Sequence, residues 1–270
     1  ANSTNALSIG ASASGSYPYQ GSMSDVRIVK GTAVYSSDFT PPTAPLTAIT
    51  NTKFLLNPET SISDLSQKHA LTCYGNVATD ATTVKFAGTK SIAFDGTGDY
   101  INISSDIELG GNDWTFETWI YAPSPVPLLT LLSQGPNSST TVSAIRVNTD
   151  GRISLQTYSG SNRVLWLANS AITAETWHHI AVTHVYNGSG AGAYKVYVDG
   201  TDVGVYSGSY SYSSSYFWNY GTISGTTLSI GRYNYNDNAD GNGYMQDVRI
   251  TKGLARYTAN FTPPTTELEG

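Results

Sequence analysis

The chain has little of several things that common functional classes need. It has one cysteine, Cys73, in 270 residues, so no disulfide can form within the chain. Charged residues make up 13% of the sequence, which is about half the usual share. The formal net charge is −6 and the pI is near 5.1, whereas a phosphate-binding surface needs clustered Lys and Arg. The composition therefore predicts no nucleic-acid partner.

Long apolar runs and reactive surroundings for the cysteine are also missing. No stretch of 18 apolar residues occurs, so the sequence predicts no membrane span. The opening ANSTNALSIG has neither the basic nor the apolar segment of a signal peptide, so we expect any export signal to lie outside this sequence. Nothing near Cys73 would activate a thiol, and we expect a buried, inert side chain.

What is present is a duplication. Residues 23–43 read MSDVRIVKGTAVYSSDFTPPT, and residues 245–265 read MQDVRITKGLARYTANFTPPT, with fourteen of twenty-one positions identical. The similarity continues backwards to an LSIG sequence that occurs at residues 7–10 and again at 228–231. Self-similarity at a fixed spacing indicates repeated domains. The offset of 222 residues, from Asp25 to Asp247, is the size of one domain.

The region between the two copies is patterned as strands and tight turns. Residues 113–123, DWTFETWIYAP, alternate apolar and polar side chains for eight residues and stop at proline. Asp-Gly pairs occur within residues 150–160 and 194–204, and DGTGD at residues 95–99 separates two β-rich runs, which predicts a hairpin. No stretch has an apolar period of 3.6 over three turns. We therefore predict an all-β, two-sheet antiparallel sandwich.

The order of these motifs resembles a known family. FDGTGDYINI, FETWIYAP, ETWHHIAVTHV, YKVYVDGTDVG and the closing LSIG with DVRITKGLARYTANFTPPT are similar to laminin-G-like domains of the concanavalin A-like lectin and glucanase superfamily, especially those of phage tail fibres. The resemblance covers about residues 52–265. It implies a jelly roll whose first and last strands lie together. Residues 1–48 are then expected to be the C-terminal remnant of a preceding laminin-G-like repeat, and residues 49–270 a complete domain.

Catalytic carboxylates are not evident. Glycosidases need two carboxyl groups flanking the scissile bond, which on a strand means acids two residues apart on one face. Asp106 and Glu108 have that spacing but lie in a loop-like SSDIELGG sequence, and Glu117 is alone on its strand beside Trp119 and Tyr121. We predict that the domain is not an enzyme.

The histidines do not have the spacing of a zinc site. His178 and His179 are adjacent and so point to opposite faces of a strand. His178 and His184 share a face but lie about 20 Å apart at 3.3 Å per residue. We expect half-buried strand histidines without a metal.

Calcium is the one cofactor that we predict, in a structural role. The family resemblance implies a calcium ion held by an acid on the last strand and by an early segment, which match Asp247 and the segment from Asp95 to Asp99. The loop YNDNADGNG, residues 235–243, adds Asp237 and Asp240 as weaker candidates. The corresponding loop of the first copy, ASASGSYPYQ, has no acid, so these two acids are not needed for the fold. A solvated acidic loop remains the alternative.

The most unusual composition lies in residues 205–221, VYSGSYSYSSSYFWNYG. Rigid aromatic rings separated by Ser and Gly are typical of antibody binding loops, and Tyr and Trp faces suit sugar rings. A long hairpin covering its own sheet or a neighbouring subunit is the alternative. The predicted contact residues are Tyr206, Tyr210, Tyr212, Tyr216, Phe217, Trp218 and Tyr220.

These features predict a structural or adhesion module rather than a catalyst. We expect a repetitive extracellular or virion-surface protein, such as a phage fibre, whose partners are copies of itself or neighbouring repeats and a cell-surface glycan. A bacterial adhesin or extracellular matrix protein carrying the same module is the alternative, as is the accessory carbohydrate-binding domain of a glycan-active enzyme.

Overall fold

The computed structural model describes residues 26–42, 46, 49–56, 62–63, 69–103, 107, 109, 112–135, 141–159, 162–186, 193–207, 227–234 and 241–268. All regular structure in these residues is β, and every strand pair is antiparallel. No helix suited to crossing a membrane occurs in this part of the chain. The chain divides into two compact units, Ala1–Ser61 and Ile62–Gly270, whereas the sequence prediction placed the division after residue 48.

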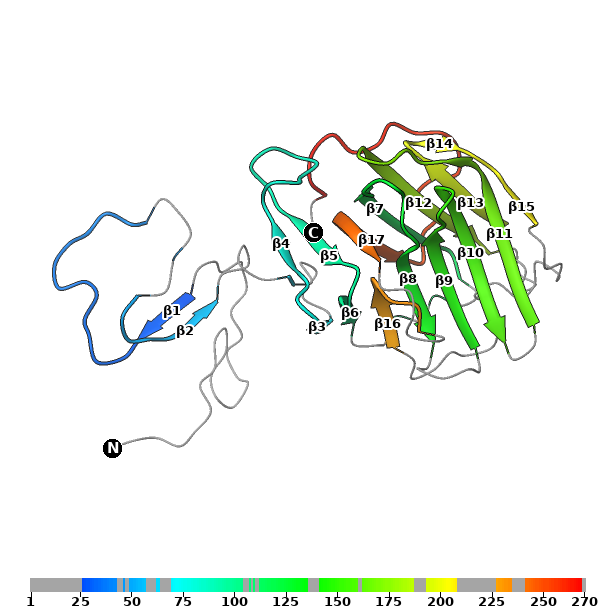
Figure 1. The fold of residues 1–270 in the computed structure, drawn as a ribbon. Helices are drawn as coiled ribbons and strands as arrows, with labels where there is room; N and C mark the ends of the chain where they lie inside the picture. Colours follow the sequence, from blue (N-terminus) through cyan, green and yellow to red (C-terminus); the bar gives the residue numbers. More distant parts are fainter. Residues whose placement is uncertain are drawn as a thin grey trace. The chain divides into compact units, whose positions relative to one another are not determined.

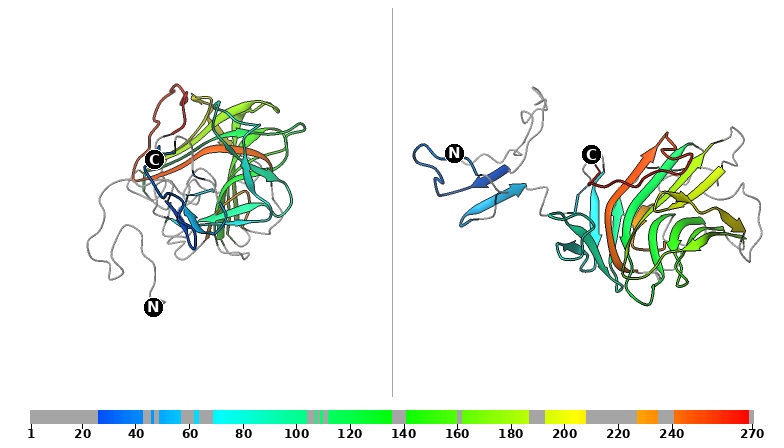
Figure 2. Two further views of the ribbon diagram at one scale, coloured as in Figure 1. Left: turned by 90° about the vertical axis from the view of Figure 1, so that its left-hand side faces the viewer. Right: turned by 90° about the horizontal axis from the view of Figure 1, so that it is seen from above.

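The larger unit consists of two antiparallel sheets (Figure 1; Figure 2), which confirms the predicted all-β sandwich. The eight-stranded sheet has the order β15 (Val205–Ser207), β11 (Asn162–Ala171), β10 (Arg152–Ser159), β9 (Thr141–Val147), β8 (Leu129–Gly135), β16 (Thr227–Ile230), β6 (Tyr100–Ile103) and β3 (Leu71–Tyr74). The seven-stranded sheet has the order β14 (Thr201–Asp202), β13 (Ala193–Val198), β12 (Trp177–Val185), β7 (Trp114–Tyr121), β17 (Asn242–Lys252), β5 (Ser91–Asp95) and β4 (Ala78–Asp80).

The core lies between the two sheets and follows the alternation of the strands. In β7, Trp114, Phe116 and Ile120 are fully buried members of the core cluster, as their even spacing requires when successive side chains point to opposite faces. Leu129 and Ile145 of the eight-stranded sheet belong to the same cluster. The strand predicted from DWTFETWIYAP thus forms at the centre of the seven-stranded sheet, with its odd-numbered residues on the outer face.

One Asp-Gly turn forms the predicted hairpin. Asp199 and Gly200 connect β13 to β14, with Val198 paired to Thr201. Both turn residues have positive φ, 50° and 77°, which is the conformation that two-residue hairpin turns of type I′ require. The Asp-Gly pair at residues 150–151 likewise lies between two paired strands, β9 and β10.

The hairpin predicted at DGTGD is wrong. Strand β5, before it, pairs with β4 and β17, whereas β6, after it, pairs with β3 and β16 in the other sheet. Gly96 and Gly98 have φ of 87° and 73°, and they turn the chain from one sheet into the other. Asp99 holds this crossing, because its carboxylate accepts hydrogen bonds from the backbone N–H groups of Asn76 and Asp95 at 2.7 and 2.9 Å.

The prediction of a buried thiol is also wrong. Cys73 is exposed, because β3 is the edge strand of the eight-stranded sheet and has only one neighbour, β6. The desolvation that remains at this edge raises the pKa of the thiol, which disfavours the reactive thiolate.

The smaller unit is a two-stranded sheet with an exposed segment between its two strands along the chain. Strand β1 (Val26–Val29) pairs with β2 (Thr52–Leu56). After β1, residues 30–42 are exposed throughout. Within them the rings of Tyr35 and Phe39 stack with centroids 3.7 Å apart. Pairing with β1 places β2 in the first compact unit.

Candidate functional site

The most elaborate polar arrangement of the larger unit lies on the outer face of its seven-stranded sheet. Residues 253–268, here called the C-terminal tail, leave β17 and return across β7, β12, β13 and β14 (Figure 1). The backbone of Arg256 donates to Thr115, Tyr197 donates to the carbonyl of Tyr257 at 3.1 Å, and the backbone N–H of Phe261 donates to the carbonyl of Gly200 at 2.9 Å. The outer face of the sheet is therefore covered by its own chain.

Two aromatic side chains fix the tail on the sheet. Tyr257 and Phe261 stack with centroids 3.6 Å apart, and Phe261 also meets the edges of His179 and Tyr197 at 5.7 and 5.4 Å. Gly200 makes this approach possible, because a Cβ at that position would overlap the carbonyl oxygen of Phe261.

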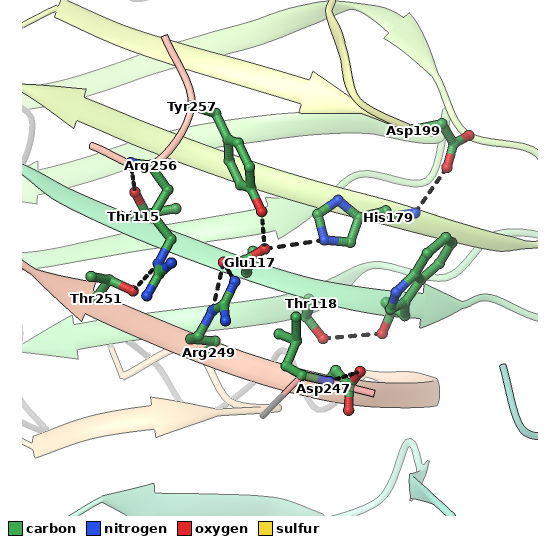
Figure 3. A network of polar contacts seen from close by, with 12 residues as sticks. Thr115, Glu117, Thr118, His179, Asp199, Asp247, Arg249, Thr251, Arg256 and Tyr257 are labelled. Carbon is green, nitrogen blue, oxygen red and sulfur yellow. Dashed lines mark hydrogen bonds and ion pairs between the residues drawn. The ribbon is translucent and has the colours of Figure 1, made fainter. Parts of the chain in front are cut away.

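Glu117 lies under the tail at the centre of the outer face. Its carboxylate is fully buried, and three side chains from three different segments point at it (Figure 3). Arg249 of β17 donates to Oε1 from Nε and Nη2 at 2.8 and 2.7 Å. The hydroxyl of Tyr257 in the tail donates to Oε2 at 2.7 Å, and Nε2 of His179 in β12 lies 3.4 Å from the same oxygen.

A bulge in β17 aims Arg249 at Glu117. Gln246 faces Trp119 and Arg249 faces Glu117, so two residues of β17 oppose Thr118. Asp247, at the bulge, has a φ of 55°. A regular strand would put residues 246 and 248 on the outer face, and the extra residue shifts that face to Gln246 and Arg249. The bulge is therefore a requirement of the Glu117 network.

The electrostatics of Glu117 indicate a group that is ionised at neutral pH. Burial alone pushes its pKa up, but the contact with His179 and the hydrogen bonds from Tyr257 and Arg249 outweigh that desolvation and lower the pKa below its ordinary 4.5. The pKa of Tyr257 is raised to about 12, by burial first and then by Glu117. A buried carboxylate with both oxygens engaged cannot donate a proton to a substrate, so this network has the character of a structural brace.

The other two strand histidines are also engaged in structure. His184 donates from Nδ1 to the carbonyl of Asn112 at 2.6 Å, and burial lowers its pKa. His178 contacts Asp199 at 2.7 Å through Nδ1 and the hydroxyl of Thr173 at 3.0 Å through Nε2. His184 and His179 are buried rather than half-buried. Among the described residues, no three His, Cys, Asp or Glu side chains gather in a group that could hold a metal.

The side chains of three residues are hydrogen-bonded in the order hydroxyl, imidazole, carboxylate, as in a catalytic triad: Thr173, His178 and Asp199. Nε2 of His178, however, also accepts the backbone N–H of Thr173 at 3.2 Å. The backbone N–H of His179 in turn donates to Asp199 at 2.9 Å. These contacts tie the loop before β12 to the β13–β14 turn, and they account for the series without a substrate.

The predicted calcium ligands do not converge. Asp95 pairs with Asn242 of β17, and Asp247 lies five residues further along that strand, which is about 16 Å at 3.3 Å per residue. Both oxygens of Asp99 already accept backbone N–H groups, and Asp247 accepts the backbone N–H of Leu268 at 3.0 Å. Burial raises the pKa of Asp247 to about 6. The three acids therefore do not fit one shared ion, and the candidates Asp237 and Asp240 lie outside the described residues.

A calcium site elsewhere on the chain remains a proposal that melting can test. An ion that binds only the folded state at 100 times its Kd adds about 2.7 kcal/mol to the unfolding free energy. We expect the melting temperature in millimolar calcium to exceed that in chelator by several degrees, with magnesium as the control for ionic strength. Identical melting curves in calcium and in chelator would show that calcium does not stabilise this fold.

The predicted aromatic contact surface is described only at its first residue. Tyr206 lies in β15, where its backbone pairs with Leu167 of β11. The others fall outside the described residues: Tyr210, Tyr212, Tyr216, Phe217, Trp218 and Tyr220.

The sequence alone does not predict the Glu117 network. Glu117 looks like a lone acid on its strand, because its partners Arg249 and Tyr257 lie 132 and 140 residues away. One available signal was the duplication. The first copy also carries an Arg and a Tyr at the matching positions, Arg27 and Tyr35.

Comparisons with known proteins agree with this architecture. A laminin G family profile described as "Concanavalin A-like lectin/glucanases superfamily" matches residues 95–255, more than half of the chain. A search of curated proteins found no significant match.

Solved structures with related folds are distant in sequence. Domain 4 of AbnA, an extracellular arabinanase from Geobacillus stearothermophilus solved with arabinotriose, is 19% identical, with 68% of this chain and 82% of that chain covered and a TM-score of 0.47. The NanB sialidase of Streptococcus pneumoniae is 16% identical over 62% of this chain and 26% of that chain, with a TM-score of 0.47. Domains LG4-5 of the mouse laminin alpha1 chain are 16% identical over 60% and 40%, with a TM-score of 0.40.

The family match spans both sheets, from the end of β5 through β17 to the start of the C-terminal tail. The chain belongs to the laminin G branch of the concanavalin A-like lectin and glucanase superfamily.

Proposed function

We propose that the chain is a non-enzymatic structural and adhesion module of a repetitive extracellular or virion-surface protein. The observation that carries this proposal is the covered outer face of the seven-stranded sheet. There the fully buried carboxylate of Glu117 is occupied by Arg249, Tyr257 and His179. A glycosidase keeps two carboxyl groups free to meet substrate, and Glu117 is not free.

A cell-surface glycan is the ligand that we propose for this module. The superfamily includes lectins by its description, and residues 206–220 contain seven aromatic side chains spaced largely by Ser and Gly. Flat aromatic faces bind the apolar face of a sugar ring, while neighbouring hydroxyls and amides bind its rim. A bacterial adhesin or an accessory domain beside a glycosidase would use the same surface, and the neighbouring genes distinguish these settings from a virion.

Replacing three aromatic residues together tests the ligand. We expect the triple variant Tyr216→Ala, Phe217→Ala, Trp218→Ala to lose retention on immobilised glycans, or assembly with other copies, while the domain still melts cooperatively. Retention on glycan arrays and the oligomeric mass by light scattering measure the two outcomes. Replacing Tyr74, which is exposed on β3, by Ala is the matched control.

A melting temperature tens of degrees lower in the triple variant would contradict this assignment. The three rings would then be part of the core, and the binding surface would have to lie elsewhere.

A further inference from the structure

The two copies of the duplicated segment have the same local structure. Tyr35 and Phe39 stack at 3.7 Å with their planes 9° apart, and the matching Tyr257 and Phe261 stack at 3.6 Å with planes 7° apart. A glycine with positive φ begins each tail, 93° in the first copy and 86° in the second. Residues 26–42 therefore form a strand and tail already shaped like residues 248–264.

Among the described residues, it is the second copy of the segment that packs on a sheet of its own chain. Tyr257 and Phe261 lie on Glu117, His179 and Tyr197, whereas Tyr35 and Phe39 are 45% and 52% exposed. Stacked rings left in water form an exposed apolar patch of the kind that marks an interaction site. The contacts of the second copy show what such a surface contains.

The edge of β1 that faces away from β2 is the edge that this surface would use. In the second copy, the N–H of Gly253 donates to the carbonyl of Asp113, the residue before β7, at 2.7 Å. Successive N–H groups of a strand point to opposite sides. The N–H of Lys252 therefore points away from β7. In the first copy the N–H of Lys30, which matches Lys252, donates to Asn51 beside β2 at 3.1 Å. Strand β2 thus takes the edge opposite to the one that pairs with β7.

One pair of differences between the copies also fits the same packing. Arg256 donates from Nε to the hydroxyl of Thr251 at 2.7 Å. At the matching positions the first copy has Val34 and Val29. Both members of a contacting polar pair are replaced by apolar residues together, so the strand and tail can still face each other across that contact.

We propose that residues 26–42 are the last strand and covering tail of the seven-stranded sheet of another domain of this fold, preceding this one in the same polypeptide. Arg27 and Tyr35 would then bind a buried carboxylate of that domain that matches Glu117, and Phe39 would lie on a turn that matches Asp199 and Gly200. The proposal deepens the proposed function and rests on its repetitive architecture. It identifies neighbouring domains as partners that are joined by a shared segment.

A fusion of the chain to itself tests this directly. Joining residues 1–246 to residues 25–270 makes a chain in which a second copy of residues 26–42, here called the junction copy, takes the place of residues 248–264 directly after the first domain. We expect two folded domains that melt within about 5 °C of each other. Tyr35→Ala in the junction copy should then lower the first domain's melting temperature by roughly 6–20 °C, while the same substitution in the original chain shifts melting by less than about 2 °C. If Tyr35→Ala leaves the melting temperature of the fusion's first domain unchanged, the proposal is overturned.

A second variant covers the case in which the fusion does not fold. Six substitutions convert residues 248–264 of the original chain into residues 26–42: Thr251→Val, Leu254→Thr, Arg256→Val, Thr258→Ser, Ala259→Ser and Asn260→Asp. Melting within about 5 °C of the original chain supports the proposal, because the first-copy sequence then fits the sheet. Unfolding of both proteins overturns it. Glycan retention by residues 206–220 is measured in a separate experiment. A failure of the shared-segment proposal would therefore leave the glycan proposal standing, and the two failures can be told apart.

Discussion

Replacing Glu117 by alanine is expected to lower the melting temperature of the domain by about 6–20 °C. Removing one partner of a buried ion pair costs about 3–5 kcal/mol, because the other charge remains buried without its counter-ion, and each kcal/mol shifts melting by about 2–4 °C in a domain of this size. Here Arg249 would lose both hydrogen bonds to Oε1, and the hydroxyl of Tyr257 would lose its acceptor. Thermal unfolding followed by circular dichroism measures the loss.

The pH dependence separates the charge of Glu117 from its packing. Its pKa in the folded protein lies below the ordinary 4.5, so its ionised form stabilises the fold above about pH 4.5, and this stabilisation is lost as the pH falls through the lowered pKa. Glu117→Gln keeps the shape but not the charge. The stability difference between wild type and Glu117→Gln should be constant from pH 8 to 5 and should shrink at lower pH.

An exposed carboxylate supplies the control for this series. Glu175→Gln removes a charge from an exposed position and should change stability by less than about 0.5 kcal/mol. A Glu117→Ala protein that melts like Glu175→Gln would show that the network is incidental to the fold.

The strands near the centre of the seven-stranded sheet could be predicted from the sequence because their information is local. The alternation in DWTFETWIYAP gave β7 its bounds, and the Asp199-Gly200 pair formed its hairpin. The DGTGD motif gave a wrong hairpin prediction because it, too, carries only local information. Its glycines predict a change of direction, but whether the next strand pairs in the same sheet or crosses to the other depends on partners such as β16, which lies more than 120 residues away.

The Glu117 network could not be predicted because its information is not local. Arg249 reaches Glu117 only through a bulge at Asp247, and nothing in the sequence of β17 alone marks where that extra residue lies. The burial of the outer face depends on a tail that follows the last strand. Strand alternation alone would have left Glu117, Trp119 and Tyr121 facing solvent, whereas Glu117 is fully buried and Trp119 is 5% exposed.

Replacing Gly200 by alanine is expected to detach the C-terminal tail from the sheet. A Cβ at this position overlaps the carbonyl oxygen of Phe261 and lies 2.9 Å from its carbonyl carbon and 3.0 Å from Cδ of Pro263. The obstructing atoms are backbone and a proline ring, which cannot rotate away. The tail must therefore move, and the hydrogen bond from the N–H of Phe261 to Gly200 is lost with it.

Gly88 provides a matched control for the backbone conformation. Its φ of 82° is close to the 77° of Gly200, but a Cβ on Gly88 meets nothing within 4 Å. Both substitutions carry the cost of about 1–2 kcal/mol for a left-handed alanine. Gly200→Ala should cost about 2–3 kcal/mol more, the burial free energy of one large apolar side chain, and should therefore melt about 4–12 °C below Gly88→Ala.

Proteolysis shows whether the additional loss comes from the tail. Arg256 lies in the tail with its backbone N–H bonded to Thr115, so trypsin cuts after it only when that segment opens. We expect Gly200→Ala, but not Gly88→Ala, to be cut there much faster than wild type under conditions in which the rest of the domain stays folded. Equal cleavage in the two variants would mean that the tail does not depend on the Asp199-Gly200 turn. Faster cleavage would show that the close approach of Gly200 to Phe261 is needed to keep the tail on the outer face, beside the ring stacking and the hydrogen bonds that also hold it there.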